Sequence, residues 1–312
     1  MKNKSQKGTN QVSKAELLAL YRSMYRIRRF EETVLEEFSH GRFFGTTHTY
    51  MGQEANAVGV LCNLESEDIV VSNHRSHGHF LAYGGDMHAL FAELMGKSTG
   101  VCAGRGGSQH LHWKNFYSNG VLGGTSPIAT GIALAEKFKS NNTVTIAFLG
   151  DGALGEGVLY ETLNMASLWS APILFILENN RIAQTTSIDL NLAGDIPSRF
   201  SAFGIHTQLL DTSDVLIIRS TAGQAINEVR QKSCPQSLIL NTHRFGPHSK
   251  GDDTRSKDEI LSLRKTFDPL SILGKRLDSS ELTTIQEEVD KEVTQAFQGA
   301  LSDPLPTAQS TM

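Results

Sequence analysis

Apolar and polar positions between residues 143 and 186 follow a pattern that predicts a strand, a helix and a second strand. Residues 144–149 and 173–177 are short apolar runs, and apolar residues recur at helical spacing across 158–169. This order makes parallel pairing of the strands the default, with ligands bound beyond their carboxyl ends. Two polar clusters stand at those ends: Gly150-Asp151-Gly152 and Glu178-Asn179-Asn180.

The rest of the chain carries the same kinds of pattern. Helical spacing predicts helices at 14–38, 127–139, 211–232 and 278–297, and apolar runs predict strands at 69–71 and 238–240. Loops are predicted at 41–54, 96–124 and 241–255. We therefore predict an α/β fold, a doubly wound parallel sheet flanked by helices. It forms one domain over residues 15–300, with flexible tails at 1–14 and 301–312.

Charged residues add two local predictions. Arg26, Arg28 and Arg29 lie among glutamates on the first helix, which is typical of a solvated, ion-paired face. Asp278 and Glu281 have the spacing of a capping box at the start of the last helix.

Composition narrows the class of protein. The 312 residues are 39% hydrophobic with a net charge of −4, so a core can form and no basic footprint for nucleic acid is present. The three cysteines form no CxxC pair, which argues against a disulfide framework or zinc site and favours a reducing, cytoplasmic setting. The polar, basic start does not resemble a secretory signal, and no apolar run approaches the length of a membrane span.

The glycine-rich segment after the first central strand has two interpretations. Gly150, Gly152 and Gly155 match the dinucleotide-binding pattern, with Glu178 where a ribose-binding acid is expected. Asp151 opposes that interpretation, because a carboxylate there repels a pyrophosphate unless a cation lies between them. Mg²⁺ fits that role, since it prefers oxygen ligands and commonly bridges side chains and phosphates. The sequence therefore predicts Asp151 and Asn180 as magnesium ligands.

Histidines are concentrated in the predicted loops. His48 stands between two turn-like segments and is a candidate functional residue, whereas Gln53 and Glu54 after it are assigned to structure. His74, Arg75, His77 and His79 follow the strand at 69–71 within six positions. A metal site there would need a third close ligand, and the helical HxxxH spacing is absent.

These motifs together resemble a known family. Gly150-Asp151-Gly152, a helix, a strand and Asn179-Asn180 resemble the thiamine-diphosphate motif. From about residue 17 to about 270 the chain is similar to α subunits of the dehydrogenase (first) component of 2-oxo acid dehydrogenase complexes. The resemblance implies a thiamine-diphosphate-binding fold and oxidative decarboxylation of a 2-oxo acid, pyruvate first among them, with acyl transfer to a lipoyl group. The implied cofactors are thiamine diphosphate and Mg²⁺.

The resemblance also assigns roles to individual residues. His48 and His248 are the implied catalytic residues, and Arg75 and His248 the implied diphosphate ligands. The backbone of Gly120 and the side chain of Leu122 are expected to hold the aminopyrimidine, and the carbonyl of Ile182 to complete the Mg²⁺ shell. His74 and Ile182 stand where relatives often have tyrosine. The remaining implied cofactor-binding residues are His74, Asp151, Gly152, Ala153, Asn180 and Ile182.

The chain has motifs for one of the two domains that thiamine enzymes need. We therefore expect a β subunit that binds the pyrimidine and supplies an activating glutamate, in an α2β2 heterotetramer, and a lipoyl acyltransferase as further partner. Neither nucleic acid nor membrane is an expected partner. Other readings of the sequence are an acetoin dehydrogenase α subunit, half of a split transketolase-like enzyme, a nicotinamide dehydrogenase and a non-catalytic subunit.

Overall fold

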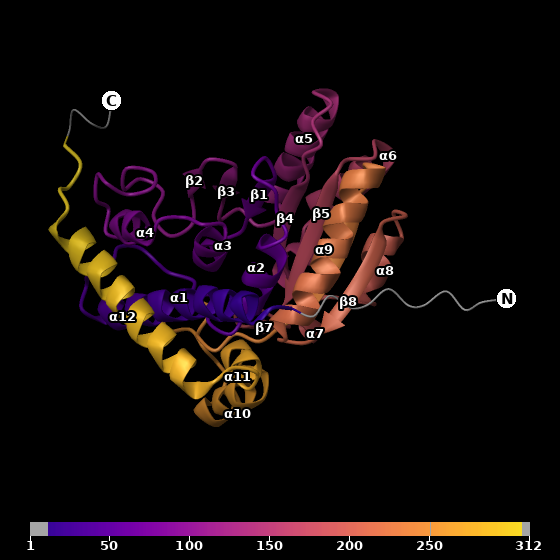
Figure 1. Ribbon diagram of the computed structural model, residues 1–312. Coiled ribbons are helices and arrows are strands. Elements are labelled where there is room, and N and C mark those ends of the chain that lie inside the picture. Colours follow the sequence, from indigo (N-terminus) through magenta and orange to yellow (C-terminus); the bar gives the residue numbers. More distant parts are fainter. Residues whose placement is uncertain (1–11, 250, 308–312) are drawn as a thin grey trace.

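A seven-stranded sheet forms the centre of the computed structural model, which describes residues 12–249 and 251–307 (Figure 1). The strand order is β2-β3-β1-β4-β5-β9-β8, and every neighbouring pair is parallel except the β2–β3 pair at one edge. A separate two-stranded ribbon pairs β6 with β7. The strands are β1 Ile69–Ser72, β2 His112–Trp113, β3 Phe116–Ser118, β4 Thr145–Gly150, β5 Ile173–Asn179, β6 Ile182–Ala183, β7 Thr186–Ser187, β8 His206–Asp211 and β9 Gln236–Asn241.

Helices cover both faces of the sheet, which confirms the predicted doubly wound α/β architecture. Successive strand residues point to opposite faces, so Ile146 and Phe148 of β4 join a core with α1, α2, α9 and α12, while Ala147 and Leu149 join a core with α5 and α6. The helices are α1 Lys14–Ser39, α2 Glu54–Leu61, α3 Ser76–Ala82, α4 Met87–Leu94, α5 Thr125–Phe138, α6 Gly157–Leu168, α7 Ile188–Asn191, α8 Ile196–Ser201, α9 Val215–Lys232, α10 Lys257–Phe267, α11 Pro269–Gly274 and α12 Ser279–Ser302.

Several predicted boundaries are wrong. The helix predicted from residue 211 begins at Val215, because residues 206–211 form strand β8. The loop predicted at 96–124 contains β2 and β3. The predicted capping box is not formed, since Asp278 makes no side-chain cap bond. Instead, Lys14 draws both carboxylates to itself, at 2.7 Å from Asp278 and 3.0 Å from Glu281.

The charged face of α1 is ion-paired, as predicted, but Arg28 on it is not solvated. Arg28 is buried and pairs with Glu54 at 2.6 Å and Asp268 at 2.9 Å. Glu54 therefore has the structural role that was predicted for it. Arg26 and Arg29 reach across to Glu292 and Asp290 of α12, at 2.8 Å each. These pairs hold α12 against α1, where Figure 1 shows the two helices crossing.

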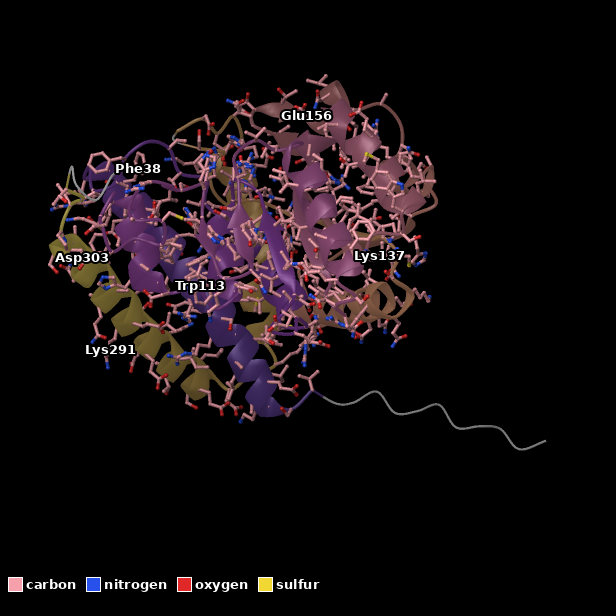
Figure 2. The ribbon with its side chains drawn as sticks, turned by 90° about the horizontal axis from the view of Figure 1, so that it is seen from above. Phe38, Trp113, Lys137, Glu156, Lys291 and Asp303 are labelled. Atoms are coloured by element: carbon pink, nitrogen blue, oxygen red, sulfur yellow. The ribbon has the colours of Figure 1, made fainter. Side chains whose placement is uncertain are left out.

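The C-terminal end of the described chain is docked on the body. Figure 2 shows α12 along one side of the molecule, with Lys291 on it and Asp303 at its end. Asp303 accepts a 2.6 Å bond from His88, and the Pro304 carbonyl accepts a 3.0 Å bond from the Ser98 amide. Residues 1–11 and 308–312 of the predicted tails lie outside the described residues. Within the described part, no helix has the length and apolar character of a membrane span.

A buried carboxylate organises the glycine-rich loop that follows α4. Glu93 of α4 accepts backbone N–H bonds from Cys102 at 2.7 Å, Gly104 at 2.9 Å, Gly106 at 2.6 Å and Gly107 at 3.0 Å. Such converging amides are an anion site, and here the protein fills it with its own side chain. The segment 104–107 is therefore a structural loop that carries Ser108 and Gln109 toward the cavity described below.

We expect Glu93→Gln to destabilise the fold by about 3 kcal/mol, because the amide has one acceptor oxygen and leaves buried N–H groups without partners. The free energy of unfolding from urea titration measures this loss. Glu287→Gln, on the exposed side of α12, is the control and should change stability by less than about 0.5 kcal/mol. Equal stability of both variants would contradict the anchoring role of Glu93.

Candidate active site

A cavity of about 260 Å³ opens at the carboxyl ends of β1, β4 and β5. Parallel α/β sheets bind ligands at this edge. The segment after β1 provides Asn73, His74 and Arg75, the turn after β4 provides Asp151, and the turn after β5 provides Asn180. The lining residues are Gln53, Asn73, His74, Arg75, Leu122, Gly150, Asp151, Gly152, Glu178, Asn180, Ile182, Ala183, Gln184 and His248.

Most of the residues singled out in the sequence meet at this cavity. Eight of them line it: His74, Arg75, Leu122, Asp151, Gly152, Asn180, Ile182 and His248. His48 lies directly behind, with its ring centroid 4.8 Å from those of both His74 and His248. Gly120 and Ala153 are not among the lining residues, and Ala153 is buried in the core beside α6.

Asp151 is a buried acid without a partner for one of its oxygens. It begins the short 3-10 turn Asp151–Gly155 (η1), and among the described residues its Oδ2 finds no hydrogen-bond donor. Burial raises the pKa of Asp151 to about 6, outweighing the nearby guanidinium groups of Arg244 and Arg75. An ionised carboxylate here is consequently short of positive partners, which is the condition that a bound cation relieves.

The guanidinium of Arg75 lines the same cavity, and that of Arg244 lies close enough to Asp151 to lower the pKa of its carboxyl. Arg75 donates to the Thr49 carbonyl at 2.7 Å and to both the Nδ1 and the carbonyl of His248 at 3.2 Å. Burial lowers the pKa of Arg75 to about 9 and that of Arg244 to about 10, so both are cationic at neutral pH. Arg244 precedes the predicted His248 by four positions and was not singled out in the sequence. The pair makes the cavity suitable for an anionic group.

The three histidines beside the cavity are neutral at physiological pH. Burial, helped by Arg75, lowers the pKa of His48 to about 3 and that of His248 to about 4. The pKa of His74 is well below its ordinary value for the same reason. Each imidazole therefore offers one N–H donor and one acceptor nitrogen, and none is a standing acid at neutral pH.

Gln53 and Gln109 are site residues that the sequence analysis missed. Gln53 lines the cavity and is buried, and neither amide atom has a hydrogen-bond partner among the described residues, so its assignment to structure alone was wrong. The Gln109 amide lies 3.2 Å from Nδ1 of His48 and orients that ring. A Cβ on Gly120 would come within 2.1 Å of Gln109 Oε1, so a larger residue there would require the Gln109 side chain to shift. Only the fold brings Gln109 to His48, so no local pattern marks it.

His77 and His79, the other two histidines that follow β1, do not line the cavity but support the residues around it. His77 is buried between Glu31, at 3.1 Å, and Ser108, at 2.9 Å, and so is not directed at the cavity. His79 stacks on Phe148 with ring centroids 3.8 Å apart and so packs in the core. It lies 3.4 Å from Glu178, which also accepts from Tyr50 and Asn56.

The geometry defines an α/β site in which a buried carboxylate and a guanidinium group line one cavity at the carboxyl ends of the strands. A model of the family described as "Dehydrogenase E1 component" matches residues 22–309. The chain is 37% identical to a pyruvate dehydrogenase E1 component subunit alpha of Zymomonas mobilis, over 96% of this chain and 88% of the relative. It is also 37% identical to the alpha subunit of an acetoin:2,6-dichlorophenolindophenol oxidoreductase of Cupriavidus necator, over 95% and 92%.

A human relative extends the similarity beyond bacteria. The testis-specific, mitochondrial form of the pyruvate dehydrogenase E1 component subunit alpha is 36% identical over 96% of this chain and 79% of its own length. The match of the family model and the near full-length similarity lead to one conclusion. This chain belongs to the dehydrogenase E1 component family.

The raised pKa of Asp151 contributes to the pH dependence of stability in the absence of metal. The neutral carboxyl favours the folded state, so this stability is complete below pH 3.8 and is lost as the pH rises through about 6. The difference between a pKa of about 6 and the ordinary 3.8 corresponds to about 3 kcal/mol. We expect Asp151→Asn to be more stable than the wild type by up to that amount at pH 8, and equally stable near pH 4.

Urea unfolding in the presence of a chelator, repeated between pH 4 and pH 8, measures this crossing. Asp258→Asn, at an exposed position of α10, is the matched control and should follow the wild type at every pH. A constant offset between Asp151→Asn and the wild type across that range would show that Asp151 does not titrate there.

Proposed function

We propose that this chain is the α subunit of a thiamine-diphosphate-dependent 2-oxo acid dehydrogenase, with pyruvate as substrate and a lipoyl group as acyl acceptor. The family and the names of the relatives support the class. The observation that carries the proposal at the site is the Oδ2 of Asp151, which has no partner among the described residues and is buried in a cavity that Arg75 lines and that Arg244 influences from nearby. A metal–diphosphate unit satisfies both at once.

The residues present fit the cofactor. Asp151 and Asn180 would hold Mg²⁺ with the Ile182 carbonyl, since oxygen ligands suit this ion. The Asn180 side chain is held close to Ile182, because its Oδ1 accepts a hydrogen bond from the Ile182 amide at 3.2 Å. Arg75 and His248 would bind the diphosphate. The residues proposed to hold the rest of the cofactor are His74, Gly120, Leu122, Gly152 and Ala153.

Thiamine diphosphate would supply the electron sink for loss of CO₂ from the 2-oxo acid. The chain's own residues would position the substrate and manage protons. His48 and His248 are the proposed catalytic residues, because their neutral rings stand 4.8 Å apart beside the cavity. A neutral imidazole donates a hydrogen bond to a developing oxyanion without carrying a charge into the ground state. Gln109 fixes how His48 presents that donor.

An exposed apolar face supports a partner chain. Ile128 and Phe138 on α5 are 54% and 84% exposed, and Met165 and Leu168 on α6 are 41% and 72% exposed. The two helix ends adjoin, since Lys137 of α5 donates to the Trp169 carbonyl at 2.8 Å. Large exposed apolar patches mark protein interfaces. We propose that a β subunit covers this face, supplies the glutamate that activates the cofactor, and completes an α2β2 heterotetramer.

The further partner and the location follow from the same function. A lipoyl acyltransferase component would receive the acyl group from the assembled enzyme. The three cysteines are free thiols, as a reducing compartment requires, and this supports a cytoplasmic location. Acetoin is the second candidate substrate, because a relative named for acetoin oxidation matches as well as one named for pyruvate, at 37% identity. A panel of 2-oxo acids and acetoin, tested on the assembled α–β enzyme, separates the two.

The double variant Asp151→Ala/Asn180→Ala should abolish cofactor binding, because it removes both side-chain oxygen ligands proposed for Mg²⁺. Calorimetric titration of thiamine diphosphate with Mg²⁺ into the purified α–β complex measures this. Asp258→Ala/Asn142→Ala, at exposed positions outside the cavity, is the matched control and should bind as the wild type does. Undiminished uptake by the first variant would refute the proposed metal–diphosphate site.

The substitution Leu168→Asp should prevent assembly with the β subunit, because it places a charge in a face that must be desolvated on binding. Light scattering coupled to size exclusion gives the mass of the assembly. Glu287→Asp on the outer face of α12 is the control and should assemble normally. If this chain alone shows full decarboxylation activity, the need for a β subunit is disproved.

A further inference from the structure

Three histidines from distant parts of the sequence meet at one edge of the cavity. His48 precedes α2, His74 follows β1, and His248 follows β9. Their ring centroids are 4.8, 4.8 and 5.4 Å apart, and one nitrogen from each lies within 4.8 Å of the other two. The sequence argued against a metal site among the histidines after β1, because a third close ligand was missing. The fold turns His77 away and provides two other partners.

The ring nitrogens are available to bind. Among the described residues, neither nitrogen of His74 has a hydrogen-bond partner, although the side chain is only 9% exposed. His48 and His248 have contacts at Nδ1, from Gln109 and Arg75, so the Nε2 of each is left to bind. In metal sites the outer ring nitrogen donates its N–H to an acceptor. Gln109 can accept from His48 once its amide turns its oxygen toward Nδ1, whereas Arg75 can only donate to His248. All three rings are neutral, which metal binding requires.

We propose that His48, His74 and His248 form a transition-metal site, selective for Zn²⁺ over Mg²⁺, in the cofactor-free chain. Three imidazoles suit zinc, copper or nickel, whereas Mg²⁺ prefers oxygen. The site is therefore chemically distinct from the one proposed at Asp151. Three protein ligands leave the fourth position of a tetrahedral ion for water.

Two costs limit the affinity. Ligand nitrogens about 2.1 Å from zinc lie about 3.4 Å apart in a tetrahedron, so the rings must close in by rotation. Binding through Nε2 also puts the proton of His248 on Nδ1, and the bond from Arg75 is then lost. The negative charge of Asp252 raises the pKa of both His48 and His248 and so partly offsets the effect of the nearby cations. These costs make the ion exchangeable and keep it from being a permanent structural metal.

The position of the site makes metal and cofactor alternatives to each other. His74 and His248 line the same cavity as Asp151 and Asn180, so an ion held between their rings occupies the approach to the diphosphate position. This competition rests on the proposed function, whereas metal binding itself does not. Zinc bound here would have to leave before thiamine diphosphate could bind, and so would slow activation of the enzyme by its cofactor.

Metal binding is tested on the full chain purified with its β subunit and freed of cofactor and metal by chelation. Calorimetry measures Zn²⁺ binding, and visible absorption of Co²⁺ reports nitrogen ligation. We expect one ion per chain in the wild type. His74→Phe should weaken binding by about 100-fold or more, because even the loss of a residue that merely supports a ligand costs roughly 10–100-fold. His112→Gln, at an exposed histidine, should leave it unchanged.

A second variant, His248→Asn, acts from a different loop and should lose the ion as well, with thermal melting checking that both variants fold. Absence of Zn²⁺ binding by the wild type, or binding that both variants retain, would overturn the proposal. Thiamine diphosphate is then titrated with Mg²⁺ in the presence of Zn²⁺. A lowered apparent affinity is expected, and simultaneous binding of both would overturn the competition. Failure to bind thiamine diphosphate at all would contradict the proposed function and leave the metal result standing.

Discussion

The energetic cost of holding a carboxylate away from water governs this site. Asp151 is placed at the end of β4 by the sheet itself, and the dry surroundings raise its pKa to about 6 despite two guanidinium groups nearby. A group so placed contributes little to the fold. The ionised carboxylate of Asp151 is stabilised only when a cation binds beside it. The guanidinium groups of Arg75 and Arg244 are in turn stabilised by an anionic ligand. The proposed metal–diphosphate unit would answer both requirements.

The support of the cavity is built from a chain of buried polar residues that do not themselves line it. Glu93 holds the glycine-rich loop, that loop carries Ser108 and Gln109, and these two contact His77 and His48. On the other side, Arg28 and Glu54 tie α1 to α2, next to Gln53. Buried polar networks of this kind are costly unless complete. Around this cavity the fold therefore uses buried polar residues that position side chains, where apolar residues would give simpler packing.

The sequence was enough to predict the central strands and the residues that meet at the cavity from their ends. It was not enough to predict the edge strands or the residues that act through distant partners. The local sequence is enough to predict β4, α6 and β5, because their hydrophobic periodicity and the glycine and proline residues between them mark each element. β4 and β5 are parallel neighbours, so Asp151 and Asn180, which follow their carboxyl ends, must lie at the same edge of the sheet. Strand β8 is half exposed and polar, so its pattern is weak. Arg28, Gln53 and Gln109 act through partners far away in the chain, and only the folded structure brings those partners together. Arg28 was consequently misjudged as surface.

The contact between Gly120 and Gln109 has an evolutionary consequence. The glycine leaves the space that the Gln109 amide occupies, and a side chain at 120 would push that amide away from its position beside His48. Substitutions at positions 109 and 120 are therefore coupled in evolution. A relative that carries a short residue at 109 is released from the requirement for glycine at 120, whereas one that keeps glutamine is not. In an alignment of close relatives the two columns should change as a pair.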